Sequence, residues 1–309
     1  MARVFVSRNL PGPALERLRQ THDVEVWPGR TPPAHDELKR HAQAADGLIT
    51  LLTDQIDKDL IDSAPNLTAI SNYAVGYDNI DVATASERGI PVGNTPDVLT
   101  DATADLTFAL LLAAARKLPQ AIEAASAGDW VTWEPGMHLG HDVHGATLGI
   151  IGFGRIGRAV AQRAQGFEMT VIHTPTRAGE GVDQQEVLAR ADFVSLHAPL
   201  TPDTHHLIGR SALETMNDTA ILINTARGQM VDQHALADAL NTGTIAGAAL
   251  DVTDPEPLPK TDPLYRAPSL IITPHIGSAT KTARNKMAEI AVDNLIAGLE
   301  GRPMPHQVN

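Results

Sequence analysis

Cysteine is absent from this chain of 309 residues, which excludes disulfides, thiolate zinc sites and cysteine nucleophiles. Basic residues are scarce relative to acidic ones, since 24 Lys and Arg stand against 37 Asp and Glu and leave a formal net charge of −13. Nucleic acid and anionic lipid are therefore not expected as partners, because both need a basic surface.

Long hydrophobic runs are also missing. The longest, residues 108–115, is far below the roughly 20 residues that span a bilayer, and residues 1–6 are too short in apolar residues for a signal peptide. We expect a cytoplasmic protein with no membrane contact.

The chain alternates short apolar runs with helix-like stretches, and its length suggests two domains. Strands are expected at residues 3–6, 24–27, 47–51 and 67–72, and in a second series at 148–151, 170–173, 193–196, 220–224, 247–250 and 270–273. This order predicts an α/β protein with two Rossmann-like or flavodoxin-like domains, each a parallel sheet covered by helices. A long apolar helix at 100–117 separates the two series, and a final helix at 282–299 is expected to return to the first domain.

A glycine-rich segment follows the strand at 148–151 and opens a helix, and it reads Gly152-Phe153-Gly154-Arg155-Ile156-Gly157. In this context the first glycine permits a tight turn, the second lets the backbone approach a pyrophosphate, and the third allows close helix–strand packing. The pattern therefore predicts dinucleotide binding. The alternative is a glycine-rich turn without a ligand.

The next strand, 170–173, lacks the acid that normally binds the adenosine ribose hydroxyls at its end. Thr176 and Arg177 follow instead and suit a 2′-phosphate, which an acid would repel. We therefore expect NADPH to be preferred, with NADH possible. The alternative is that Arg177 is a solvated loop residue.

An arginine, a carboxylate and an imidazole follow the last three predicted strands, as Arg227, Glu256 and His275. This set suits the reduction of a 2-keto acid, because histidine is a proton donor with a pKa near neutrality and arginine pairs with a carboxylate. A neighbouring glutamate would orient the imidazole. The alternatives are a surface ion pair for Arg227, a solvated charge for Glu256 and a helix cap for His275.

At these residues the chain resembles the D-isomer-specific 2-hydroxyacid dehydrogenase family over nearly its full length. The resemblance is nearest to the glyoxylate reductase/hydroxypyruvate reductase branch. The motifs that carry it are residues 72–81 and 92–106, the glycine segment, residues 223–228 and residues 273–278.

The resemblance implies a catalytic set in which Arg227 binds substrate, His275 is the acid/base and Glu256 is its partner. It implies that the amides of Val75 and Gly76 bind the substrate carboxylate and that Leu52 lines the pocket. Asp251 would meet the nicotinamide carboxamide. The other residues assigned to the cofactor are Thr103, Thr225, Ala226 and Gly277.

The same resemblance implies a substrate-binding domain at residues 1–99 plus 283–309, a dinucleotide-binding domain at 100–282, and an active site in the cleft between them. It also implies a homodimer joined through the nucleotide domains. Two departures matter: Pro175 and Thr176 stand where this branch often has a small polar residue and an arginine, and Glu256 replaces the glutamine of formate dehydrogenase relatives.

No metal is expected, because His138, His141 and His144 are better explained by packing than by ligation. Other functions remain open from sequence. They are a sister enzyme acting on D-lactate or D-3-phosphoglycerate, and a nucleotide-sensing protein of corepressor type.

Overall fold

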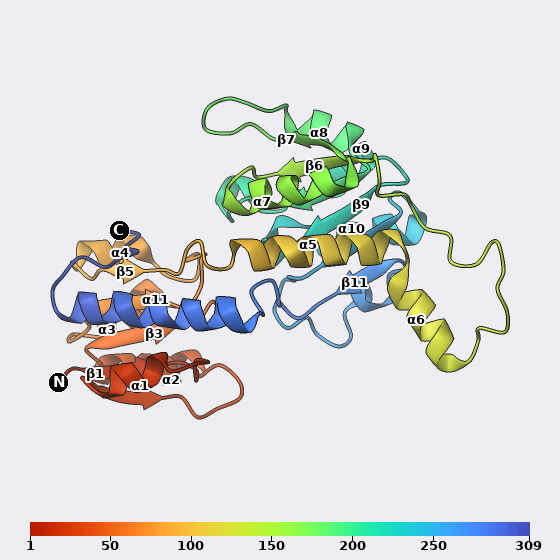
Figure 1. Cartoon of the computed structure of the whole chain (residues 1–309). Coiled ribbons are helices and arrows are strands. Elements are labelled where there is room, and N and C mark those ends of the chain that lie inside the picture. Colours follow the sequence, from red (N-terminus) through yellow and green to blue (C-terminus); the bar gives the residue numbers. More distant parts are fainter. The chain divides into compact units, whose positions relative to one another are not determined.

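The computed structural model describes all 309 residues and divides into two compact units. Unit 1 comprises Met1–Leu99 and Ala279–Asn309, and unit 2 comprises Thr100–Ser278. The chain thus returns to unit 1 slightly before residue 283, where the sequence places the boundary. Both units are α/β (Figure 1), as the sequence predicts.

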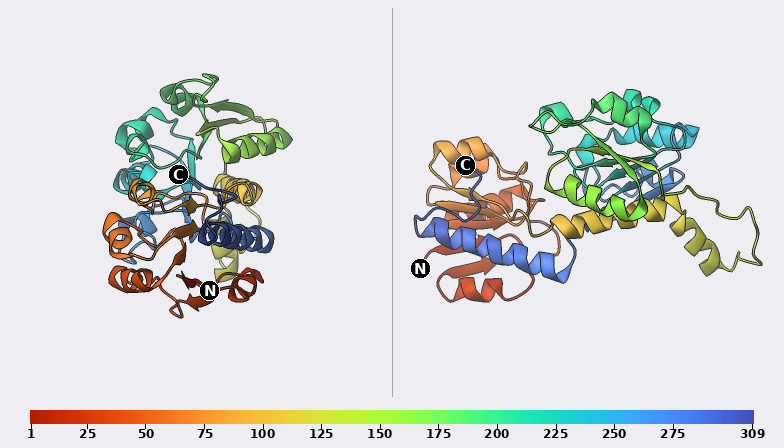
Figure 2. Two further views of the ribbon diagram at one scale, coloured as in Figure 1. Left: turned by 90° about the vertical axis from the view of Figure 1, so that its left-hand side faces the viewer. Right: turned by 45° about the horizontal axis from the view of Figure 1, so that its top comes forward.

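Unit 1 is built on a five-stranded parallel sheet with the order β2-β1-β3-β4-β5. Helices cover the sheet on both faces (Figure 2). The strands are β1 (Arg3–Val6), β2 (Asp23–Val26), β3 (Gly47–Thr50), β4 (Ala69–Asn72) and β5 (Val92–Gly93). The helices are α1 (Ala14–Arg19), α2 (His35–Ala44), α3 (Lys58–Ser63), α4 (Val82–Glu87) and α11 (Lys281–Leu299).

Successive residues of the unit 1 strands enter different cores, because side chains alternate between the two faces of a sheet. On β1, Val4 and Val6 pack with α1 and α11, whereas Phe5 packs with α2 and α3. The inner strands β3 and β4 are buried along their whole length, whereas β2 at the sheet edge carries Asp23 and Glu25.

The C-terminal segment completes unit 1. Helix α11 packs on β4 and α1, which confirms the expected return of the final helix. Beyond it, the amide of Val308 donates to the carbonyl of Val92 at 2.9 Å, and the amide of Asn94 donates to the carbonyl of His306 at 3.1 Å. Residues about 200 positions apart in sequence therefore share one sheet edge.

Unit 2 is built on a six-stranded parallel sheet with the order β11-β10-β9-β8-β6-β7. Numbered within the unit, this is 2-1-3-4-5-6, the winding of unit 1 with one strand added, in line with the expected Rossmann-like or flavodoxin-like sheet. The strands are β6 (Thr147–Ile151), β7 (Thr170–His173), β8 (Phe193–Leu196), β9 (Ile221–Asn224), β10 (Gly247–Leu250) and β11 (Leu270–Ile272). The α-helices are α5 (Thr100–Ala115), α6 (Leu118–Ala127), α7 (Arg155–Ala164), α8 (Gln184–Arg190), α9 (Arg210–Thr215) and α10 (Gln233–Thr242). Short 3₁₀ turns lie at Gln165–Phe167, Pro202–Thr204, Gly228–Met230 and Pro263–Arg266.

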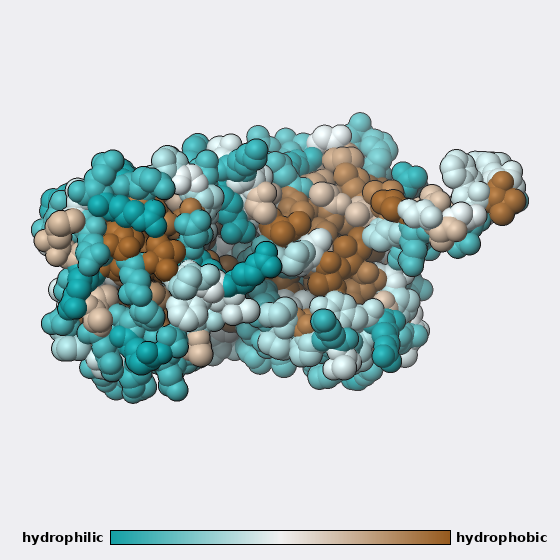
Figure 3. Space-filling view, turned by 90° about the horizontal axis from the view of Figure 1, so that it is seen from below, coloured by the Kyte–Doolittle hydropathy of each residue, from teal (hydrophilic) through white to brown (hydrophobic).

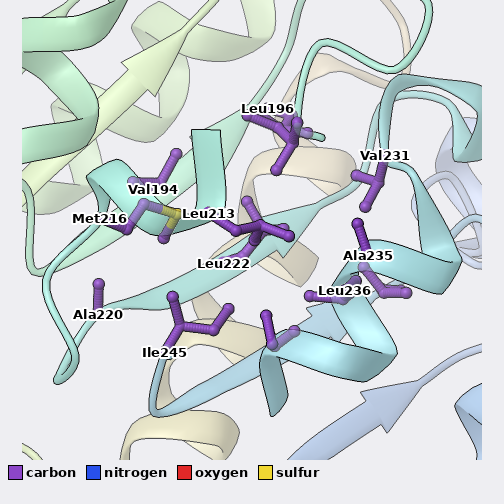
Figure 4. Close-up of a cluster of buried hydrophobic side chains, with 14 of the residues drawn as sticks. Val194, Leu196, Leu213, Met216, Ala220, Leu222, Val231, Ala235, Leu236 and Ile245 are labelled. Atoms are coloured by element: carbon purple, nitrogen blue, oxygen red, sulfur yellow. The ribbon is translucent and has the colours of Figure 1, made fainter. Parts of the chain in front are cut away.

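Two cores flank the sheet of unit 2. Leu222 on β9 packs with α8, α9 and α10, including Leu213 and Leu236 (Figure 4), whereas its neighbours Ile221 and Ile223 pack with α5 and α7. The sheet is thereby fixed from both sides, which gives the loops at its carboxyl edge a rigid base.

None of the helices has the length and apolar character needed to cross a bilayer.

Candidate active site

The glycine loop follows β6 at the point where the strand order of unit 2 reverses, which is where ligands bind open parallel sheets. Gly152 has φ +96°, and a β-carbon there would lie 2.3 Å from the amide nitrogen of Ala198. A β-carbon on Gly157 would lie 2.4 Å from the carbonyl oxygen of Gly152. These two positions therefore require glycine for packing within the protein.

Gly154 differs from the other two glycines because nothing lies within 4 Å of where its β-carbon would be. It is the N-cap of α7, and because glycine has no side chain, no side chain caps the amides of the first helical turn. Open space in front of a helix N-terminus fits a pyrophosphate, whose charge these amides stabilise. The loop thus fits a dinucleotide.

The end of β7 is held against the glycine loop by a neutral residue. The hydroxyl of Thr174 accepts a hydrogen bond from the amide of Gly152 at 3.0 Å. Thr176 and Arg177 follow in a tight turn, in which the amide of Thr176 donates to the carbonyl of Glu180 at 2.8 Å and Arg177 is exposed. No acid stands at the strand end, so a 2′-phosphate would meet no carboxylate there.

Arg227 lies in a turn organised by the side chain of Asn224, the last residue of β9. The Asn224 amide group donates to the carbonyl of Arg227 at 2.8 Å, and its oxygen accepts from the amide of Ala226 at 2.9 Å. One guanidinium nitrogen of Arg227 donates to the carbonyl of Ala226 at 2.8 Å. A buried amide side chain therefore fixes the turn that presents the arginine.

Asp251 follows β10 and holds the loop that carries His275. Its carboxylate accepts from the hydroxyl of Thr273 at 2.6 Å and from the amides of Ile276 and Gly277 at 2.8 and 2.7 Å. Burial raises the pKa of Asp251, and these hydrogen bonds oppose the shift. Asp251 therefore fixes the His275 loop from inside unit 2.

His275 and Glu256 form a hydrogen-bonded pair. The Nδ1 atom of His275 lies 2.8 Å from Glu256 Oε2, and both side chains remain about a quarter exposed. The other oxygen of Glu256 accepts from the amide of Thr253 at 3.1 Å. A carboxylate accepts hydrogen bonds, so it keeps a proton on Nδ1 and leaves Nε2 to exchange a proton with another molecule.

The backbone at His275 has φ +53°, a left-handed conformation that is uncommon outside glycine and asparagine. Its amide donates to the carbonyl of Asp251 at 2.8 Å, which helps to hold this conformation. Strained backbone persists where the surroundings impose it, and such positions cluster at active sites.

Thr103 and Thr107 of α5 lie together with Thr225 and Gly277, and all but Thr107 are assigned to the cofactor. The hydroxyl of Thr107 bonds the carbonyl of Thr103 at 2.9 Å and lies 3.0 Å from the hydroxyl of Thr225. A β-carbon on Gly277 would lie 3.3 Å from the carboxylate of Asp251 and 3.5 Å from the side chain of Thr103. The cluster joins α5 to two carboxyl-edge loops of the sheet.

His197, which follows β8, was not expected from sequence. Burial lowers its pKa to about 3, so the ring is neutral, and its Nε2 lies 2.8 Å from the hydroxyl of Ser195. Asn224 and Thr253 were missed for a related reason. Asn224 is a polar residue at the end of an apolar strand, and Thr253 lies in the loop after β10, which are the only signals the sequence gives for them.

The substrate residues expected in unit 1 follow two of its strands. The carbonyls of Val75 and Gly76 accept from the side-chain amides of Asn94 and Asn72, at 2.7 and 2.9 Å. The amide N–H groups of Val75 and Gly76 have no acceptor within the protein. Successive free amides of this kind bind anions. Leu52 follows β3 and is 37% exposed.

No group of three or more His, Asp or Glu side chains in the chain has a metal-binding arrangement. Of the three histidines weighed above, His144 has Glu168 as its neighbour, with 4.0 Å between the nitrogen and the oxygen.

Comparison with known proteins gives a consistent result. Residues 108–277 match the family model described as D-isomer specific 2-hydroxyacid dehydrogenase, NAD binding domain. A glyoxylate reductase of Korarchaeum cryptofilum is 45% identical over 317 residues, covering 99% of this chain and 96% of that protein. One from Thermococcus gammatolerans is 47% identical over 320 residues, with the same coverage of 99% and 96%.

Solved structures agree over the whole chain. The TT0316 protein of Thermus thermophilus has a TM-score of 0.93 at 51% identity, covering 99% of this chain and 100% of that chain. An NADPH-dependent glyoxylate/hydroxypyruvate reductase of Sinorhizobium meliloti, in complex with NADP and malonate, has a TM-score of 0.85 at 32% identity, covering 99% and 96%. The chain therefore belongs to the D-isomer specific 2-hydroxyacid dehydrogenase family.

Proposed function

We propose that this protein reduces small 2-keto acids, glyoxylate and hydroxypyruvate, to their 2-hydroxy acids, in the D configuration where the product is chiral. The observation that carries the proposal is the His275–Glu256 pair, which lies in the same unit as the glycine loop and leaves Nε2 free. Relatives named glyoxylate reductase, similar over the full length of the chain, support the substrate class.

His275 supplies the proton in this reaction. The carbonyl oxygen takes the proton from Nε2 as the carbonyl carbon gains a hydride, and the ring is left neutral. Glu256 holds the ring in orientation through its hydrogen bond with Nδ1. In the reverse direction Nε2 takes the proton back.

A nicotinamide nucleotide supplies or accepts the hydride when bound. In unit 2 the glycine loop and the first turn of α7 would hold its pyrophosphate, and Thr103, Thr225, Ala226 and Gly277 would contact it. Support comes from the open space at Gly154 and from the uncapped amides of α7. We infer that NADPH is preferred, since β7 ends in a neutral threonine and Arg177 is exposed after it.

The substrate carboxylate is proposed to pair with the guanidinium of Arg227, which also polarises the keto oxygen. The free amides of Val75 and Gly76 are proposed as further donors to this carboxylate, with Leu52 as an apolar contact. The carbonyls of these two residues are hydrogen-bonded to the side chains of Asn94 and Asn72. This supports the role, because the amides of Val75 and Gly76 are held in place before the substrate binds.

The test is to follow oxidation of NADPH and NADH with glyoxylate, hydroxypyruvate, pyruvate and 3-phosphohydroxypyruvate. We expect the highest kcat/KM for NADPH with glyoxylate or hydroxypyruvate. Faster turnover of pyruvate or of the phosphorylated acid would replace the proposed substrate with that of a sister enzyme. Tight nucleotide binding without turnover of any acid would overturn the proposal.

We also propose a homodimer that is joined through an arm of unit 2, formed by α6 and residues 128–142. The arm projects from unit 2 (Figure 1), and apolar atoms lie on its surface (Figure 3). Trp130, Val131 and Trp133 are 62%, 91% and 74% exposed. Exposed apolar groups of this size are typical of protein–protein interfaces, and a second copy of the chain is the expected partner.

Sedimentation equilibrium tests this assembly. The wild type should sediment at twice the chain mass, and Val131→Glu combined with Trp133→Ser should sediment at the chain mass. Tyr265→Glu, a change at another exposed aromatic residue of unit 2, should leave the dimer intact. A monomeric wild type would contradict the assembly.

A further inference from the structure

Phe153, the second residue of the glycine segment, is part of a three-residue stack. Its ring lies parallel to that of His173, with 3.7 Å between ring centroids and 7° between the planes. The guanidinium carbon of Arg158 lies 5.2 Å from the centroid of the same Phe153 ring. Because a guanidinium over an aromatic face is attracted to it, the ring restricts where the Arg158 side chain points.

The stack lies where β6 and β7 end. His173 is the last residue of β7, and its Nδ1 is 2.9 Å from the carbonyl oxygen of Thr174. Thr174 is in turn bonded to Gly152. In nucleotide-binding sheets the end of the second strand faces the adenosine ribose. Arg158, though it comes from α7, is thus brought to the strand end that lacks an acid.

The positive charge near the end of β7 favours the binding of an anion. Arg158 and Arg177 are both exposed, and no ion pair joins either of them to a carboxylate. By contrast, Arg163, on the same helix as Arg158, is paired with Asp101 and Asp105. Glu180 is the one acid in the turn after β7, so the two arginines outnumber it.

We propose that Arg158 is a second residue that selects NADPH, with its guanidinium held over Phe153 to bind the 2′-phosphate alongside Arg177. The inference rests on the proposed preference for NADPH and adds a residue from α7 to it. It also accounts for the lack of an arginine at Thr176, since the charge is supplied from the helix instead of the strand end. Two arginines placed around one phosphate share its three peripheral oxygens.

The test measures binding of two adenosine fragments, 2′,5′-ADP and 5′-AMP, to the full chain by isothermal titration calorimetry. Arg158→Gln should weaken 2′,5′-ADP roughly tenfold, about the effect of one charge-assisted hydrogen bond, and should leave 5′-AMP unchanged. Phe153→Leu should weaken 2′,5′-ADP less, because the charge remains but is no longer restrained. Arg210→Gln, which removes an exposed arginine from α9, is the matched control and should change neither constant.

Each outcome decides a separate question. If Arg158→Gln binds 2′,5′-ADP as the wild type does while Arg177→Gln binds it more weakly, the role of Arg158 is overturned and the preference for NADPH stands. If the wild type binds 2′,5′-ADP no more tightly than 5′-AMP, the preference itself fails and the inference fails with it. A tenfold loss in both fragments would mean that Arg158 supports the loop in general and does not select the phosphate.

Discussion

The two units share a sheet winding but present different chemistry at their strand ends. Unit 2 places Arg227, Glu256 and His275 in the loops after β9, β10 and β11. After β4, unit 1 places uncharged groups there, namely the backbone amides of Val75 and Gly76 and the side chains of Asn72 and Asn79. The same fold therefore presents ionisable side chains in one unit and fixed neutral donors in the other, which illustrates why function is argued from a site and not from a fold.

The difference extends to how loops are held. In unit 2 a carboxylate, Asp251, fixes the loop of His275 through three hydrogen bonds. In unit 1 the side chain of Asn79 donates to the carbonyls of Leu51 and Asp54, both at 3.0 Å. We expect changes in unit 2 to act on the chemical step and on nucleotide binding, and changes in unit 1 to act on substrate affinity.

The largest effect is expected from His275→Asn. Asparagine tolerates the left-handed backbone at this position but cannot supply the proton, so kcat should fall roughly 100- to 10,000-fold. The dissociation constant of NADPH, measured by fluorescence titration, should stay within about twofold of the wild type. Turnover near the wild-type rate would show that proton transfer does not depend on His275.

Gly154→Val should remove nucleotide binding while leaving the fold intact. The space at the β-carbon position is open, so the free energy of unfolding should change by less than about 1 kcal/mol, while the new side chain fills the place expected for the pyrophosphate. We expect the dissociation constant of NADPH to rise roughly 100-fold or more.

Gly157→Ala is the contrasting control, because its β-carbon would meet the carbonyl oxygen of Gly152 at 2.4 Å. It should lower the melting temperature, which Gly154→Val should not. Unchanged nucleotide affinity in Gly154→Val would contradict the assignment of the glycine loop.

Asn79→Ala tests the role given to unit 1. It removes two hydrogen bonds to loop carbonyls and one acceptor for Asn72, so stability should fall by about 1–3 kcal/mol. The KM for the keto acid should rise roughly 5- to 10-fold, with kcat within about twofold of the wild type, because the loops that carry Leu52 and Gly76 lose their support. A fall in kcat at unchanged KM would contradict the expectation that changes in unit 1 act on substrate affinity.

The smallest effect is expected from Asp54→Asn, at a buried acid of unit 1. Burial raises the pKa of Asp54, and hydrogen bonds from Ser7 and from the amide of Leu51 only partly oppose this shift. A carboxyl with a raised pKa in the folded state binds more protons there than in the unfolded chain. Stability therefore falls as pH rises from the ordinary value near 3.9 through the raised value.

In Asp54→Asn this pH dependence should flatten, with a change at neutral pH of about 1 kcal/mol or less. Urea denaturation at several pH values measures it. An unaltered slope of stability against pH would mean that Asp54 titrates alike in both states.

Local signals in the sequence predict much of the fold and of the site. Strand position follows from short apolar runs, and the glycine loop follows from spacing, because both depend on neighbours in the chain. The predictions were wrong at the ends of some helices and strands. The helix expected at 100–117 stops at Ala115, since Lys117 takes φ +50°, and the strand expected from residue 67 begins at Ala69, although Leu67 is buried.

Contacts between distant segments were beyond the sequence. The stack of Phe153, His173 and Arg158 joins β7 to α7 through ring geometry, and no spacing rule encodes it. The bond from Gly152 to Thr174 is similar, because the position where an acid was sought turns out to hold a loop together.

The pairing of residues 306–308 with β5 has a consequence for how the protein is made. During synthesis, residues 1–99 leave the ribosome first but lack α11 and the segment that lines the edge of their sheet. Unit 2 is continuous in sequence, so it can fold as soon as residue 278 has emerged. Domains usually fold as units during translation, N-terminal first, and we expect the reverse order here. Unit 1 is thus expected to become native only after unit 2, when α11 and residues 306–308 have been made.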